Sequence, residues 1–133
     1  MLPAIDRAFT LASASPLTMT RGCGDSALRL GQTMEFKGEA PVAVDVSTEA
    51  PQLGLNLMTR RGVCTGSMRI ERLNGPMVLD LATGVVAATL LQGKIVLPDG
   101  RKLADLATLV LATKAVELEA ECCLVAIAMV HEA

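Results

Sequence analysis

The chain has 133 residues, 51% of them hydrophobic, and a formal net charge of −2. One domain accommodates a chain of this length and buries about two thirds of its unfolded surface. The longest uncharged apolar run near the C-terminus, residues 122–130, is far shorter than the roughly 20 residues of a membrane-spanning helix. Asp6 and Arg7 interrupt the stretch that would form the apolar part of a signal peptide. We therefore expect no transmembrane segment and no signal peptide, and a location in the cytoplasm or in a virion.

The composition predicts a core that is poor in aromatic residues. The sequence contains no Trp, no Tyr and two Phe, and its mean hydropathy is +0.45. Such a chain is apolar for a free monomer, so either its core is unusually large or neighbouring subunits cover part of its apolar surface. Charge is uneven, because residues 1–59 sum to −2, residues 60–102 to +4 and residues 103–133 to −4. This pattern fits either complementary surfaces between subunits or the solvated faces of one monomer.

Residues 1–16 are predicted to form an N-terminal arm or a short helix. Four apolar residues recur there at helical spacing, namely Leu2, Ile5, Phe9 and Ala12. Pro16 ends the segment, because the residue before a proline is driven out of helical backbone. Residues 17–133 are then predicted to form a single β-rich domain.

Alternations of apolar and polar residues follow one another along the next part of the chain. In residues 28–37, Leu, Met and Phe alternate with Arg, Thr, Glu and Lys, which is typical of an antiparallel strand with one buried face. Glycine and proline turns separate this stretch from further strand-like runs. These runs are residues 42–46, 53–57, 68–73, 77–81, 85–91 and 94–97.

Residues 103–113 are ambiguous, and we interpret them as a short helix rather than a strand. Leu103, Leu106, Leu109 and Val110 share one helical face, and Ala and Leu favour helix. Leu111 departs from this stripe, which keeps the strand interpretation open.

Residues 116–130 form the longest segment that can lie in a core on both faces. Glu117, Glu119 and Glu121 share one face of a strand, whereas on a helix they would leave no apolar stripe. From Cys122 onwards both faces are apolar, as in a central strand that is covered on both sides. The segment is therefore predicted to be a strand that leaves a solvated rim and enters the core of a monomer or a subunit interface.

These elements predict a mainly β fold. Turn signals recur about every 8 to 12 residues, a spacing typical of all-β sandwiches and barrels. We expect an antiparallel sandwich or barrel of about eight or more short strands, with one or two short helices.

The four cysteines do not have the spacing of a metal site. Zinc ligands usually come in pairs about two to four residues apart, whereas Cys23 and Cys64 are isolated and Cys122 and Cys123 are adjacent. A bridge between Cys23 and Cys64 stays open, although the absence of an export signal favours free thiols. Cys122 and Cys123 are interpreted as small buried hydrophobic residues. No metal and no cofactor are expected.

No set of residues in the sequence predicts catalysis. The single histidine, His131, lies near the C-terminus, and a catalytic triad needs an imidazole that is held by a third group. The carboxylates of Glu117, Glu119 and Glu121 could act in acid–base chemistry, but on one face of a strand they are interpreted as a solvated rim. No phosphate-binding glycine loop is present. We therefore expect that the protein is not an enzyme.

A candidate basic surface consists of Arg60, Arg61, Arg69 and Arg72. Such residues could line a phosphate track. Without Trp or Tyr, however, the chain lacks the stacking platforms of proteins that bind single strands. Nucleic acid is therefore not an expected partner, and neither is a membrane.

The leading hypothesis is a non-enzymatic structural subunit of a larger assembly, such as a capsid decoration or tail protein of a phage virion. The chain would form a homo-oligomer or bind other structural proteins. The candidate interface residues are Leu2, Ile5, Phe9, Val125, Ile127 and Met129. The alternative is a small-molecule-binding β-barrel with an apolar interior.

Overall fold

The structure is a computed structural model that describes residues 4–13, 17–21, 24–39, 42–45 and 52–132. These residues form ten β-strands and one short 3-10 helix, η1 (Leu81–Thr83). Every strand pair whose register is described is antiparallel. The predicted mainly β fold with few helices is therefore confirmed. No helix of the described residues is long and apolar enough to cross a membrane.

The chain folds as two compact units. The first, here called the N-unit, comprises Met1–Ser67 with Glu132–Ala133, and the second, the C-unit, comprises Met68–His131. The predicted boundary between an arm and a domain at residue 16 stays a prediction.

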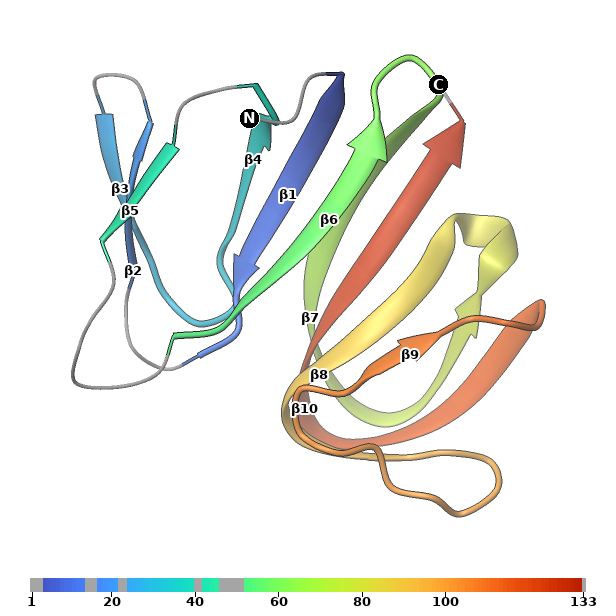
Figure 1. Ribbon diagram of the computed structural model, residues 1–133. Helices are drawn as coiled ribbons and strands as arrows, with labels where there is room; N and C mark the ends of the chain where they lie inside the picture. Colours follow the sequence, from blue (N-terminus) through green and yellow to red (C-terminus); the bar gives the residue numbers. More distant parts are fainter. Residues whose placement is uncertain (1–3, 14–16, 22–23, 40–41, 46–51, 133) are drawn as a thin grey trace. The chain divides into compact units, whose positions relative to one another are not determined.

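The N-unit contains two three-stranded sheets (Figure 1). One has the order β4-β1-β6, from β4 (Thr33–Lys37), β1 (Ile5–Leu11) and β6 (Gly54–Arg60). The other has the order β3-β2-β5, from β3 (Gly24–Leu28), β2 (Leu17–Arg21) and β5 (Val42–Asp45). Side chains from both sheets meet in one core of Leu11, Leu17, Met19, Leu28 and Phe36.

The N-terminal segment is a strand, so the prediction of a short helix is wrong for residues 5–11. β1 is the middle strand of its sheet, and Phe9 pairs with Met34 on one side and with Asn56 on the other. The apolar spacing did not distinguish a helix from a strand. Ile5 and Phe9 are four residues apart, so they share a face of a strand as well as a face of a helix. The pairing of β1 with two neighbouring strands makes this segment a strand.

The C-unit is built on one four-stranded sheet of order β7-β10-β8-β9. Its strands are β7 (Cys64–Asp80), which begins in the N-unit, β10 (Ala115–Glu132), β8 (Val85–Val96) and β9 (Thr108–Val110). The fully buried side chains include Leu79, Leu90, Ile95, Val125 and Ile127. Residues 123–127 of β10 are all buried, whereas Glu117, Glu119 and Glu121 are exposed. The predicted strand with a wet face followed by two dry faces is therefore confirmed.

The helix predicted for residues 103–113 is wrong. Leu106 lies in a turn with a φ of 64°, and Thr108, Leu109 and Val110 pair with Thr89, Ala88 and Ala87 of β8. The local preference of Ala and Leu for helix is worth only tenths of a kcal/mol per residue and is easily overridden by tertiary pairing.

The pairing of β8 with β10 is interrupted where β10 bends (Figure 1). The register shifts between Glu121 and Leu124, and Cys122 has a left-handed backbone with a φ of 47°. Opposite this bulge stands Gly93, with a φ of 98°. A Cβ at Gly93 would lie 2.5 Å from the carbonyl oxygen of Cys122 and 2.8 Å from the Cα of Cys123. Only glycine allows the two strands to approach this closely at a bulge of this kind.

We predict that Gly93→Ala destabilises the protein more than Gly100→Ala. Both glycines have positive φ, so either substitution is expected to cost about 1 kcal/mol of backbone strain. At Gly100 an added Cβ meets nothing within 4 Å, whereas at Gly93 it meets backbone atoms that cannot rotate away. We expect a loss of about 1 kcal/mol for Gly100→Ala and at least about 3 kcal/mol for Gly93→Ala, measured by urea unfolding. Equal losses in the two variants would contradict the close approach.

Candidate functional site

Arg7 places a charged group on a face of β1 that is otherwise apolar. Side chains alternate along a strand, so Arg7 shares its face with Phe9 and Leu11, and Leu11 belongs to the N-unit core. Arg7 pairs in register with Phe36 of β4 and with Met58 of β6. The inner face of this sheet therefore runs from a buried apolar core to a guanidinium group.

The guanidinium of Arg7 is only partly satisfied by the described protein groups. Its Nη2 donates a hydrogen bond to Asn56 Oδ1 over 2.9 Å, and its Cζ lies 4.9 Å from the ring centroid of Phe36, within the range of a cation–π contact. Its Nε is shielded from solvent and has no hydrogen-bond partner among the described residues. Leaving a buried donor unpaired costs about 1–3 kcal/mol, so a group of this kind is a place where a ligand or a water belongs.

The residues around Arg7 combine apolar walls with access to solvent. We call Arg7, Phe36, Asn56 and Met58 the Arg7 site. Asn56 is exposed, and so is Met58, at 52%. Phe36 is buried, and the ring of Phe9 lies so close to Gly54 that a Cβ at Gly54 would clash with it. Aromatic and thioether groups thus border a cation that is open on one side.

A depression of about 370 Å³ in the N-unit is lined by Arg7 and Phe36 but not by Asn56 or Met58. Its other lining residues are Asp6, Glu35, Lys37, Thr65 and Gly66. Asp6, Glu35 and Lys37 alternate with Arg7 and Phe36 along β1 and β4, so they belong to the opposite face of the sheet. The buried polar residues of the described chain are all threonines, Thr10 and Thr59 in the N-unit and Thr89 in the C-unit. Among the described residues, the buried side-chain donor without a partner is therefore the Nε of Arg7 in the N-unit.

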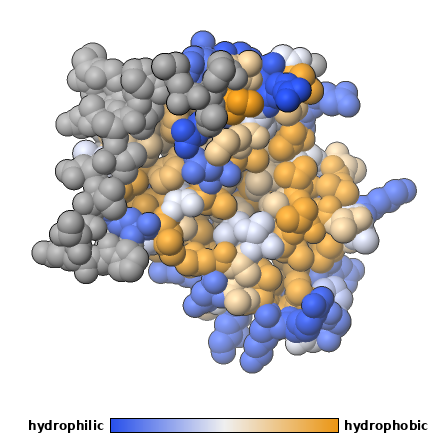
Figure 2. Space-filling model, viewed as in Figure 1, coloured by the Kyte–Doolittle hydropathy of each residue, from blue (hydrophilic) through white to orange (hydrophobic). Residues whose placement is uncertain are grey.

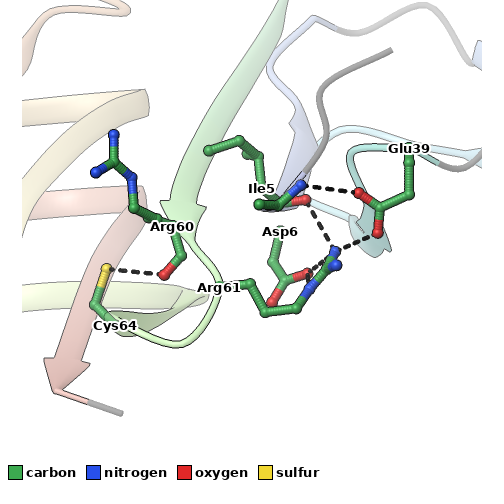
Figure 3. Close-up of polar contacts among 7 residues, drawn as sticks. Ile5, Asp6, Glu39, Arg60, Arg61 and Cys64 are labelled. Carbon is green, nitrogen blue, oxygen red and sulfur yellow. Dashed lines mark hydrogen bonds and ion pairs between the residues drawn. The ribbon is translucent and has the colours of Figure 1, made fainter.

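A second charged cluster, centred on Arg61, ties together the ends of three N-unit segments (Figure 3). Arg61 Nη2 lies 2.8 Å from Asp6 Oδ1 and 2.6 Å from Glu39 Oε1. Glu39 Oε2 also accepts a hydrogen bond from the backbone N–H of Ala4 over 3.2 Å. The side-chain hydrogen bond from Arg61 lowers the pKa of Glu39, and hydrogen bonds to Asp6 and then Glu39 raise the pKa of Arg61. Two carboxylates compensate this arginine, so its role is structural.

We predict that Arg61→Gln raises the pKa of Glu39. In the native protein the lowered pKa means that the contact is present above the ordinary pKa of a glutamate and is lost as the pH falls through the lower, folded value. Removal of the guanidinium should move the midpoint upward, measured by NMR titration of the Glu39 side-chain carboxyl. Arg69→Gln is the control, because Arg69 pairs with Glu71. An unchanged Glu39 midpoint in Arg61→Gln would contradict the cluster.

The structure gives the candidate interface residues different surroundings. Val125 and Ile127 are 1% and 0% exposed in the core of the C-unit, so they offer no surface to a partner. Met129 packs against that core, and Ile5 and Phe9 are half-buried in the N-unit. Leu2 lies outside the described residues.

The four arginines of the candidate basic surface are divided between the two units. Arg60 and Arg61 belong to the N-unit, and Arg69 and Arg72 belong to the C-unit. Arg61 and Arg69 form ion pairs with carboxylates, at 2.8 Å to Asp6 and 2.7 Å to Glu71. A basic surface shared by these four residues stays a prediction.

Three of the four cysteines lie within the described residues. Cys64, Cys122 and Cys123 are free thiols, whereas Cys23 lies outside the described residues. Cys123 is buried as predicted, but Cys122 is exposed because the bulge turns it out of the core. In the described part of the chain, no three His, Cys, Asp or Glu side chains are grouped so that they could hold a metal ion.

The Arg7 site was not predicted from the sequence, where Arg7 stood only as an interruption of an apolar stretch. The signal in the sequence was the alternation of side chains, because Ile5, Arg7, Phe9 and Leu11 occupy alternate positions. In a strand, alternate positions share one face, so the arginine lies on the apolar face. Asn56 had no signal of its own, since 49 positions separate it from Arg7.

The fold and the site together define a small antiparallel β protein with an accessible cation on an apolar inner face. The chain belongs to the HutD family, whose model matches residues 1–126. It is similar to HutD from Pseudomonas fluorescens SBW25, solved in a formate condition, with 15% identity and a TM-score of 0.73 over 99% of this chain and 71% of that one. It is also similar to a conserved protein of unknown function from Pseudomonas aeruginosa PAO1, with 14% identity and a TM-score of 0.71 over 96% of this chain and 71% of that one. No curated protein sequence matches the chain significantly.

These similarities correct the leading functional hypothesis. A phage virion component, whether a capsid decoration or a tail protein, is contradicted by the family match and by the two bacterial structures. The error came from the apolar composition, which was attributed to contacts between subunits. Much of that apolar surface is buried in the cores of the two units instead.

Proposed function

We propose that the chain is a small-molecule-binding protein that takes up an organic carboxylate at the Arg7 site. The observation that carries this proposal is the buried Nε of Arg7, which has no hydrogen-bond partner among the described residues. Membership of the HutD family, together with the antiparallel β fold shared with HutD from Pseudomonas fluorescens, supports a small-molecule site in a β structure. Ligand sites are common in the mouths of β-barrels.

A carboxylate fits the donors that the site presents. A guanidinium offers N–H groups in a fixed fork, and carboxylates accept two of them in parallel. Arg7 uses Nη2 for Asn56, which leaves Nε as the buried donor for the ligand. The ring of Phe36 lies against the guanidinium and limits access of water to the new hydrogen bond, which strengthens it.

The remainder of the ligand is expected to be small and partly apolar. Met58 is exposed on the inner face next to Arg7, and its flexible thioether adapts to ligands of different shape. This proposal narrows the alternative of a small-molecule-binding β-barrel with an apolar interior, because an entirely apolar ligand would leave the Nε donor of Arg7 unpaired.

We propose binding rather than catalysis at this site. An arginine stays protonated and a methionine or asparagine does not exchange protons near neutral pH. These side chains can therefore hold and orient a carboxylate without supplying a general base. On this proposal the chain recognises a metabolite and does not convert it.

We predict that Arg7→Gln weakens carboxylate binding by about 10- to 100-fold, because a hydrogen bond to a charged group contributes about 1.5–3 kcal/mol. Isothermal titration calorimetry with formate, acetate and butyrate would measure the affinity, and the corresponding amides would show whether charge is required. The matched control is Arg29→Gln, since Arg29 is an exposed arginine of the same unit outside the Arg7 site.

Two outcomes would contradict the proposal. One is unchanged carboxylate affinity in a folded Arg7→Gln variant, with folding verified by circular dichroism. The other is an Nε–H resonance of Arg7 that does not move in NMR spectra when a saturating carboxylate is added. Equal binding of carboxylates and amides would argue for an uncharged ligand.

A further inference from the structure

β9 leaves one edge of the C-unit sheet open. It is the last strand in the order β7-β10-β8-β9, and its described strand partner is β8. Sheet edges are usually protected by charged residues or proline, but β9 reads Thr-Leu-Val. Val110 is 69% exposed, more than any other large hydrophobic residue in the described chain. Figure 2 shows apolar side chains gathered on the part of this unit that carries β8 and β9.

The hydrogen bonds of the described strands show which backbone groups point to this open edge. The N–H of Leu111 donates to the carbonyl of Val86, and the carbonyl of Ala107 accepts from the N–H of Leu90. Consecutive residues of a strand direct their N–H and C=O groups to opposite edges. Ala107 and Leu111 face β8, so the backbone groups of Thr108 and Val110 face away from it.

We propose that a second copy of this chain docks on β9, so that the two β9 strands pair antiparallel about a two-fold axis. Thr108 of each copy then lies opposite Val110 of the other, and Leu109 lies on the axis. In this register the outward groups of both strands meet, and each Thr108–Val110 pair exchanges both of its N–H···O bonds. A shift of this register by one residue would place residues whose backbone groups point toward the partner opposite residues whose backbone groups point toward β8. Such residues cannot exchange hydrogen bonds, so the alternation along β9 selects the register.

Charge complementarity around β9 identifies a second copy as the occupant. Asp105 precedes the strand and Lys114 follows it, and neither forms an ion pair with another described residue. Antiparallel pairing brings the Asp105 end of one copy beside the Lys114 end of the other, and the two-fold axis repeats the contact. A surface that is complementary to itself is what a symmetric homodimer requires.

The test is the molar mass of the full chain across a range of protein concentrations, measured by sedimentation velocity. The paired stretch of β9 is short, so few hydrogen bonds join the two copies. The wild-type protein is therefore expected to be a dimer that dissociates on dilution. Val110→Lys places a charge on the paired edge and should weaken dimerisation at least 10-fold. Val63→Lys is the control, because Val63 is a similarly exposed valine, at 61%, in a turn of the N-unit. It should leave the dimer intact.

A charge exchange tests the orientation of the pair. Asp105→Lys alone and Lys114→Asp alone each place like charges beside each other and should weaken the dimer, whereas the double variant should recover it. Amide hydrogen exchange at Thr108 and Val110 should slow as the concentration rises.

The proposal is overturned by a wild-type monomer at every concentration, or by a dimer that Val110→Lys leaves unchanged. It is also overturned if the double charge variant fails to recover dimerisation. These outcomes concern β9 and are separate from carboxylate binding at Arg7, so either proposal can fail while the other holds.

Discussion

Backbone pairing of β1 with a strand on each side determines which of its side chains face the core of the N-unit. Because the side-chain period of a strand is two, a slip of one residue would bring Ala8 and Thr10 to the inner face and turn Arg7 and Phe9 away from it. The registers with β4 and β6 agree, since Arg7 pairs with Phe36 in one and with Met58 in the other. The position of the guanidinium is thus a consequence of strand register, and the aromatic ring and the amide that contact it come from the same two neighbours.

The same two-residue period determines which side chains of β10 are buried in the C-unit, until a bulge interrupts the alternation. Alternation along β10 keeps the glutamates in water and Leu118 and Ala120 in the core. A left-handed residue at Cys122 inserts a bulge, after which both faces of the strand are dry. The bulge is possible because Gly93 on β8 has no side chain to collide with the displaced backbone. One exposed face and one fully buried segment can therefore belong to one strand.

An element could be predicted correctly from the sequence only where its apolar pattern distinguished the helical period from the strand period. At residues 116–121 the three glutamates excluded a helix, and the strand was predicted correctly. At residues 5–9 the apolar spacing of four satisfied both periods, and at residues 103–113 the stabilising contacts were with β8, at positions about 20 residues away in the chain. The Arg7 site depends on a contact between strands 49 positions apart, and one sequence without relatives contains no record of such a pairing.

The functional error has a related physical cause. Composition measures how much apolar surface a chain has, but it does not say whether that surface is covered by the chain itself or by a partner. Val125 and Ile127 were assigned to an interface, and both are buried in their own unit. A single charged residue that shares a face with the core is more informative than an excess of apolar residues. Hydrophobic burial alone does not explain why a charged residue lies on such a face. An unpaired, buried N–H donor destabilises the fold unless another group accepts its hydrogen bond. The N-unit tolerates that cost at Arg7, whereas the described side chains of the C-unit include no such buried, unpaired donor. On the proposed function, a carboxylate bound at Arg7 would remove that cost and stabilise the N-unit as it binds.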